Sequence, residues 1–265
     1  MADSLIPDTS NDCYPALVVF DLDACCWCVL ARARSAARDA TLIAPTHRNL
    51  RYPEMYMMSS GAPFRKTGDL NVMESCKGEA VKLLGMTRPV WALLVGTERF
   101  RRTRVAVASR CDEPAWAREL LKMFEAEPGV SFWDACDGGE LCEIYKGSKK
   151  DHFRALQKKT NIAFDDMLFF DDDPARARAS AFFFCVRTRW NDLPQANIRD
   201  VSSLGVVCVL TPRGVTGGCW EQGLRDFAKS KGRPAPILWG LSDEPPADSE
   251  PPAEASGEPR PWYKA

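Results

Sequence analysis

Excess charge is the first thing this sequence lacks, since 35 Lys and Arg against 36 Asp and Glu give a formal net charge of −1. We therefore expect neither nucleic acid nor an anionic membrane as a partner. No apolar run is long enough for a transmembrane helix. Residues 1–10 have neither a basic leader nor an apolar core, so we expect no signal peptide.

Histidine is scarce, with two in 265 residues, and the 11 cysteines lack the spacing of metal ligands. We interpret the cysteines as reduced thiols, which favours the cytoplasm and leaves an organelle as an alternative. The composition is 45% hydrophobic and 27% charged, which suits one domain with a substantial core. We expect that domain over residues 14–240, a flexible N-terminus over 1–13 and a disordered Pro- and Glu-rich tail over 241–265.

Two apolar runs end abruptly in carboxylates: LVVFDLDAC at residues 17–25 and MLFFDDD at 167–173. Continuous apolar runs of this length are typical of buried parallel strands. Asp21 and Asp23 would point to opposite faces of an ideal strand, so both reach one site only if the backbone bends. Acidic ends of two neighbouring strands would gather several carboxylates in one place, which predicts a site for a hard cation.

Strands and helices alternate along the rest of the chain, which predicts an α/β fold with a central parallel sheet and right-handed crossovers. We expect strands at 103–110 and 203–210 and helices at 114–124, 151–159 and 220–229. Residues 55–82 are expected to form hairpin or loop structure over the site. They are too few for a domain-sized cap.

Four ordered segments resemble the magnesium-dependent phosphatase branch of the haloacid dehalogenase-like (HAD) family. They read DLDACCW at 21–27, ASR at 108–110, GSKKDHF at 147–153 and FFDD at 169–172. The resemblance covers roughly residues 14–230. It implies a three-layer Rossmann-like fold, without a cap or with a minimal flap, and Mg²⁺ as cofactor.

The resemblance assigns catalysis to four residues. Asp21 would be the nucleophile that forms an aspartyl phosphate, and Asp23 the general acid and then the general base. Ser109 and Lys149 would cradle the phosphate, with Lys150 as the alternative if the turn is shifted by one. Substrate binding is assigned to Leu22, Asp23, Ser109, Arg110 and Lys149.

The metal would be held by Asp21, by the backbone carbonyl of Asp23 and by Asp172. Asp171 would orient ligands or water beside it. Because Asp171, Asp172 and Asp173 are consecutive, the choice among them stays open. We expect His152 and Trp27 to be packing residues.

Three features depart from the family pattern. Cys25 stands where many members have Thr, and a thiol is a weaker hydrogen-bond donor, so we expect reduced activity. Residues 28–51 and 174–196 look inserted beside catalytic motifs, and we favour a non-catalytic origin for both. A substrate lid, translated non-coding sequence and disordered surface loops are the three interpretations.

The leading functional hypothesis is a Mg²⁺-dependent phosphomonoesterase, acting as a monomer on a phosphorylated small molecule or a phosphoprotein. The resemblance points to protein tyrosine or phosphosugar substrates. The alternative is a catalytically impaired domain that binds phosphate or a partner. A phosphomutase is disfavoured, because no large cap would exclude water.

Overall fold

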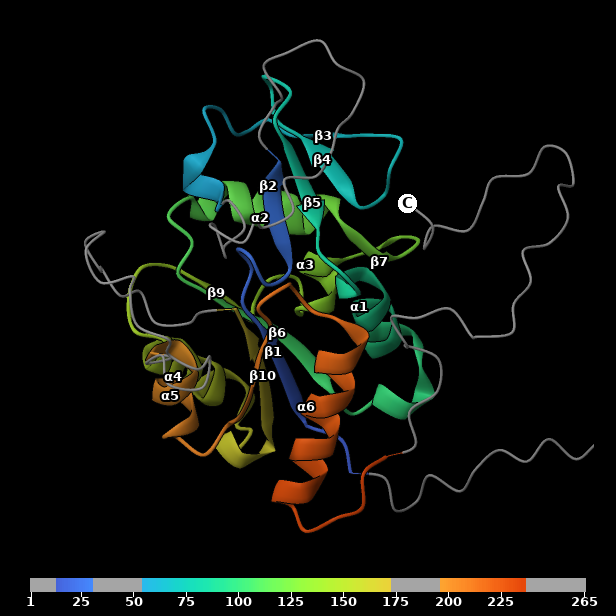
Figure 1. Cartoon of the computed structure of the whole chain (residues 1–265), viewed down its shortest axis with the longest axis vertical. Coiled ribbons are helices and arrows are strands. Elements are labelled where there is room, and N and C mark those ends of the chain that lie inside the picture. The colour runs from blue at the N-terminus through green and yellow to red at the C-terminus, as the bar shows by residue number, and fades with distance from the viewer. Residues whose placement is uncertain (1–12, 31–53, 173–195, 237–265) are drawn as a thin grey trace, which may run out of the picture.

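A five-stranded parallel sheet forms the centre of the molecule (Figure 1). The computed structural model describes residues 13–30, 54–172 and 196–236. The strand order is β11-β10-β1-β6-β9, and the bounds are β1 Leu17–Phe20, β6 Arg104–Ser109, β9 Cys142–Ile144, β10 Met167–Asp171 and β11 Val207–Leu210. This order confirms the predicted α/β class.

Helices cover both faces of this sheet because the central strands are apolar on both sides. Two neighbouring residues of β10 point to opposite faces. Phe169 contacts Phe153 of the helix at 149–160, while Phe170 stacks on Phe20 of β1 and on Trp220 of the helix at 217–230. Such alternation is what a strand buried on both faces requires. The helices are α1 Thr87–Gly96, α2 Pro114–Met123, α3 Phe132–Ala135, α4 Lys149–Thr160, α5 Ala196–Ser202 and α6 Gly217–Ser230, with single turns η1 Met55–Met57, η2 Glu98–Phe100 and η3 Phe164–Asp166.

The predicted elements lie close to where they were expected. The helices expected at 114–124, 151–159 and 220–229 correspond to α2, α4 and α6, and α4 begins two residues earlier than expected. The last strand is shorter than predicted, because β11 begins at Val207 and residues 203–205 form the turn after α5. Among the described residues, no helix has the length and apolar character needed to cross a membrane.

A second, antiparallel sheet stands beyond the carboxyl ends of the parallel strands (Figure 1). Its order is β2-β5-β4-β3, with bounds β2 Trp27–Leu30, β5 Ala80–Leu83, β4 Val72–Glu74 and β3 Arg65–Lys66; the small pair β7 Glu125–Glu127 and β8 Val130–Ser131 lies apart. Residues 28–30, the first of the segment that we interpreted as an insertion, belong to β2 and pair with β5. The remainder of that segment lies outside the described residues, as does nearly all of 174–196.

Candidate active site

Three carboxylates meet where β1 and β10 end. The two strands are paired in parallel so that Phe20 lies opposite Phe170, which places Asp21 beside Asp171. The ladder continues into the site, because Asp21 N donates to Phe170 O at 2.9 Å. Asp21, Asp171 and Asp172 each bring a carboxylate oxygen within 4.8 Å of the others. This group is called the acidic cluster below, and Asp173 lies outside the described residues.

Lys149 is the cation of the site. Ser148 caps α4 by accepting from Lys150 N, so that Lys149 is the first helical residue and its side chain is almost fully buried. Its Nζ lies 2.8 Å from Asp21 Oδ1 and 3.2 Å from Asp171 Oδ2, and it donates to Ala108 O at 2.5 Å. These partners match the three donors of an ammonium group.

Electrostatics keeps this lysine charged. Burial alone would lower the pKa of Lys149, but the carboxylates of Asp21 and Asp171 outweigh it and raise the pKa above its usual value. The sequence left Lys149 and Lys150 as alternatives, and the structure brings Lys149 to the acidic cluster.

The acidic cluster has the chemistry of a Mg²⁺ site. Its three carboxylates are oxygen ligands of the kind that hard cations prefer, and two of them also contact the Lys149 ammonium. In the described part of the chain, the buried Oδ1 of Asp21 has the Lys149 ammonium at 2.8 Å and accepts no further hydrogen bond. A cation bound to these carboxylates would use that oxygen. The residues present therefore fit the metal.

Asp23 lies apart from the acidic cluster, in a tight loop after β1. Ala24 has a φ of 61°, in the left-handed region, which supplies the backbone bend that the sequence required. Leu22 O closes the loop by accepting from Cys26 N at 2.8 Å and from Trp27 N at 3.1 Å. Burial is the main reason that the pKa of Asp23 is raised to about 6, with the charge of Asp21 adding to it.

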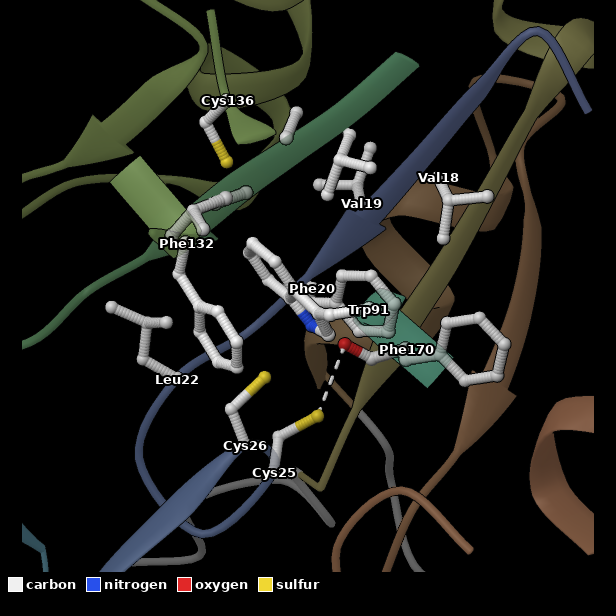
Figure 2. Close-up of a cluster of buried hydrophobic side chains, with 14 of the residues drawn as sticks. Val18, Val19, Phe20, Leu22, Cys25, Cys26, Trp91, Phe132, Cys136 and Phe170 are labelled. Atoms are coloured by element: carbon white, nitrogen blue, oxygen red, sulfur yellow. Dashed lines mark hydrogen bonds between the residues drawn. The ribbon is translucent and has the colours of Figure 1, made fainter. Parts of the chain in front are cut away.

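Cys25 ties this loop to β10. Its Sγ donates to Phe170 O at 3.5 Å, as Figure 2 shows, and accepts from Thr211 Oγ1 at 3.3 Å. The thiol thus links the loop after β1 to the ends of β10 and β11. The reduced activity that we expect from Cys25 stays a prediction.

Ser109 and Arg110 follow from β6. Ser109 is the last residue of that strand, is buried and accepts from Cys111 N at 3.2 Å. Arg110 is half-buried directly after it. The Leu22 side chain points into the core (Figure 2), so only its backbone could contact a substrate.

Two polar contacts of the site were not predicted from the sequence. Asn197 of α5 is buried and donates from Nδ2 to Asp171 Oδ2 at 3.2 Å. Trp27 Nε1 donates to Asp23 Oδ1 at 3.0 Å. No periodicity or spacing marks either contact, because each joins residues across a turn or between distant elements. His152 packs as expected, with Nε2 at 3.1 Å from Tyr145 O.

Comparison with known proteins gives the family. The acid phosphatase family model matches residues 13–186. A human relative, magnesium-dependent phosphatase 1, is 32% identical over 185 residues, covering 69% of this chain and 83% of the relative. A HAD-like hydrolase superfamily protein of Schizosaccharomyces pombe is 29% identical over 75 residues, 28% of this chain and 44% of that protein. The carboxylates at the strand ends and these similarities agree: the chain belongs to the acid phosphatase family of HAD-like, magnesium-dependent phosphatases.

Proposed function

We propose that this phosphatase hydrolyses phosphomonoesters in two displacements, with Asp21 as the nucleophile. The observation that carries the proposal is the ion pair between Asp21 and Lys149, 2.8 Å apart at the end of β1. The ammonium holds the Asp21 carboxylate in place and provides positive charge where a phosphoryl group would lie.

Each half-reaction uses the same residues. Asp21 attacks phosphorus, the bond from phosphorus to the leaving oxygen breaks, and Asp23 gives that oxygen its proton. In the second step the Asp23 carboxylate takes a proton from water, which attacks the phosphoryl group and frees Asp21. A pKa of about 6 for Asp23 suits a group that must both donate and accept near neutral pH.

The remaining residues bind the charges of the phosphoryl group. We assign its equatorial oxygens to the Ser109 hydroxyl, Lys149 and the Leu22 backbone, and a more distant anionic or polar group to Arg110. Mg²⁺ would be held by Asp21, Asp172 and the backbone carbonyl of Asp23. It would shield the negative charges and polarise phosphorus. Asp171, held by Lys149 and Asn197, would keep these ligands oriented.

We further propose a protein tyrosine or phosphosugar substrate and a cytoplasmic monomer. The antiparallel sheet β2-β5-β4-β3, which we call the flap, has strands of two to four residues and is too small for a domain-sized cap, so we expect an open site that accepts a bulky substrate. The ten cysteines among the described residues are free thiols, which supports a reducing compartment.

Hydrolysis of p-nitrophenyl phosphate tests the mechanism, with Mg²⁺ and with EDTA, for the natural chain and for Asp21→Asn. We expect Mg²⁺-dependent turnover that falls by at least about 10³-fold in the variant. The second candidate function, an impaired phosphate-binding domain, is favoured by Cys25 in the place of the family's Thr. It predicts no turnover, together with thermal stabilisation by inorganic phosphate.

A further inference from the structure

The indole of Trp27 is bonded to the carboxyl group that we propose as the general acid. Its Nε1 donates to Asp23 Oδ1 at 3.0 Å, within a loop of five residues that the two side chains close. This inference rests on the role proposed for Asp23 above. It concerns which group holds that carboxyl in a reactive orientation.

Trp27 is fixed on every side. It is fully buried, begins β2 and pairs with Leu83 of β5. Its ring stacks on Phe124, with centroids 6.1 Å apart and an interplanar angle of 28°. Its backbone N donates to Leu22 O, and its own carbonyl accepts from Ala24 N at 2.7 Å. The N–H therefore has a set direction before any substrate binds.

An indole N–H differs from the other partner of Asp23. The thiol of Cys111, buried just beyond Ser109, lowers the pKa of the Asp23 carboxyl, while its Sγ lies 3.9 Å from Met55 Sδ. A thiol can donate or accept, so it does not determine which Asp23 oxygen is the acceptor. Trp27 Nε1 can only donate, so it always needs an acceptor lone pair on Oδ1.

We propose that Trp27 is a positioning residue for proton transfer: by holding Oδ1 as an acceptor, it fixes the rotation of the Asp23 carboxyl and leaves Oδ2 to carry the proton. In the first step, Oδ2 gives its proton to the bridging oxygen as that oxygen takes the electron pair of the breaking bond. In the second step, Oδ2 receives a proton from the attacking water. Without the N–H, the carboxyl rotates and fewer bound complexes have the proton in reach.

Leaving groups of different basicity test the proposal. A nitrophenolate leaves readily without a proton, whereas an unsubstituted phenolate depends much more on the acid, and the two aryl phosphates have nearly the same shape. The best variant carries benzothienylalanine at position 27, which replaces the indole N–H by sulfur at nearly constant ring volume. Trp27→Phe is the second variant, and Asp23→Asn sets the loss expected when the acid is absent.

We expect kcat/KM for phenyl phosphate to fall about ten-fold in both Trp27 variants and kcat/KM for p-nitrophenyl phosphate to fall less than about two-fold, because only part of the acid's contribution is lost. This ratio reports the first displacement, in which the leaving group departs, whereas the second displacement is the same for both substrates. Phe124→Leu is the matched control, since it disturbs the packing of Trp27 and keeps the N–H. It should lower kcat/KM for both substrates by the same factor.

Two results would overturn the inference, and they have different meanings. If Asp23→Asn discriminates between the leaving groups and the benzothienylalanine variant does not, Trp27 has only a packing role and the proposed mechanism stands. If Asp21→Asn keeps activity or Asp23→Asn shows no discrimination, the proposed mechanism fails and this inference fails with it. Thermal unfolding of each variant identifies a loss that comes from misfolding.

Discussion

At the scale of single residues, burial and charge pairing have opposite effects on the free energy of the Lys149 ammonium. Burying an ammonium costs several kcal/mol of solvation free energy unless close partners offset it. The carboxylates of Asp21 and Asp171, at 2.8 and 3.2 Å, and the carbonyl of Ala108 offset that cost. The charged pair thus has a fixed position inside the protein, so the phosphate binding that we propose for it would need little reorganisation.

The buried His152 should make the free energy of unfolding depend on pH. Its Nε2 bonds Tyr145 O, while its Nδ1 is buried and has no partner among the described residues. Burial, aided by the positive charge of Lys149, lowers the pKa of His152 from 6.5 to about 4. Between these two pH values the unfolded chain binds a proton at His152 and the native state does not. The contribution of His152 to the free energy of unfolding is therefore present above pH 6.5 and is lost as the pH falls toward about 4.

Urea denaturation across this pH window, for the natural chain and His152→Gln, checks the prediction. The loss of unfolding free energy should be smaller in the variant. Asp23 acts with the opposite sign, because its raised pKa lets the native state bind a proton between pH 3.8 and about 6. The difference between the two chains removes that common contribution. Equal pH dependence in both would contradict the prediction for His152.

At the scale of elements, four of the five parallel strands were predicted from the sequence, whereas β9 and the second sheet were not. β1 and β10 are continuous apolar runs with acidic ends, and such runs have few alternatives to a buried parallel strand. Residues 55–82 mix short strands with turns, so the sequence predicts a hairpin region without its pairing. β2 was not predicted because it begins at Trp27, the last residue of the motif at 21–27, and continues into the segment that we interpreted as an insertion.

The residues of the site likewise divide into those that the sequence could place and those that it could not. Residues at strand ends could be placed from the sequence alone, because the carboxyl ends of neighbouring parallel strands share one edge. Asn197 and the indole of Trp27 could not be placed, because their contacts with Asp171 and Asp23 depend on side-chain directions set by packing. The choice between Lys149 and Lys150 likewise needed the start of α4.

The flap is anchored by Glu79, which leads to a prediction at this scale. Its carboxylate accepts from the backbone N and Oγ of both Ser59 and Ser60, at 2.9–3.0 Å. Burial alone would raise the pKa of Glu79, but these hydrogen bonds outweigh it and lower the pKa. Glu79→Ala removes the two oxygens that accept all four hydrogen bonds, so we expect faster amide exchange in residues 54–61 and a higher KM for bulky substrates.

Hydrogen exchange followed by mass spectrometry measures this opening. Glu74→Gln is the matched control, since Glu74 lies in the same sheet and pairs with the exposed Arg65. Exchange in residues 54–61 should be unchanged in the control. Protection that survives Glu79→Ala would mean that the packing of Met55, which is fully buried, holds the flap by itself.

At the scale of the whole molecule, the site lies between two sheets that the chain joins repeatedly. It leaves β1 for β2, returns by way of β5 to α1, and reaches the parallel sheet again at β6. The loop 21–26 therefore carries the residues that we propose for catalysis and also connects the two sheets. A movement of the flap sheet would displace Asp23 first, because Trp27 of β2 is hydrogen-bonded to the Asp23 carboxyl.

The last prediction concerns the two segments that depart from the family pattern. The ion pairs of Lys149 with Asp21 and Asp171 use no residue of either segment, and Asn197, which donates to Asp171, lies just after the second one. We therefore expect a chain in which residues 31–51 and 174–195 are each replaced by a short Gly-Ser linker to fold and to hydrolyse p-nitrophenyl phosphate with Mg²⁺. The replacements must begin after Leu30 and stop before Ala196, because β2 and α5 include those residues.

Shortening each connection from about twenty residues to about six also lowers the entropic cost of loop closure by about 1 kcal/mol, so Tm should not fall. Turnover equal to or above that of the natural chain would support a non-catalytic origin for both segments. The same shortened chain with Asp21→Asn is the control for contaminating phosphatases. A cooperative thermal transition without turnover would mean instead that one of the segments contributes to catalysis. Restoring them singly would show which one, because the first segment follows β2 and the second follows β10.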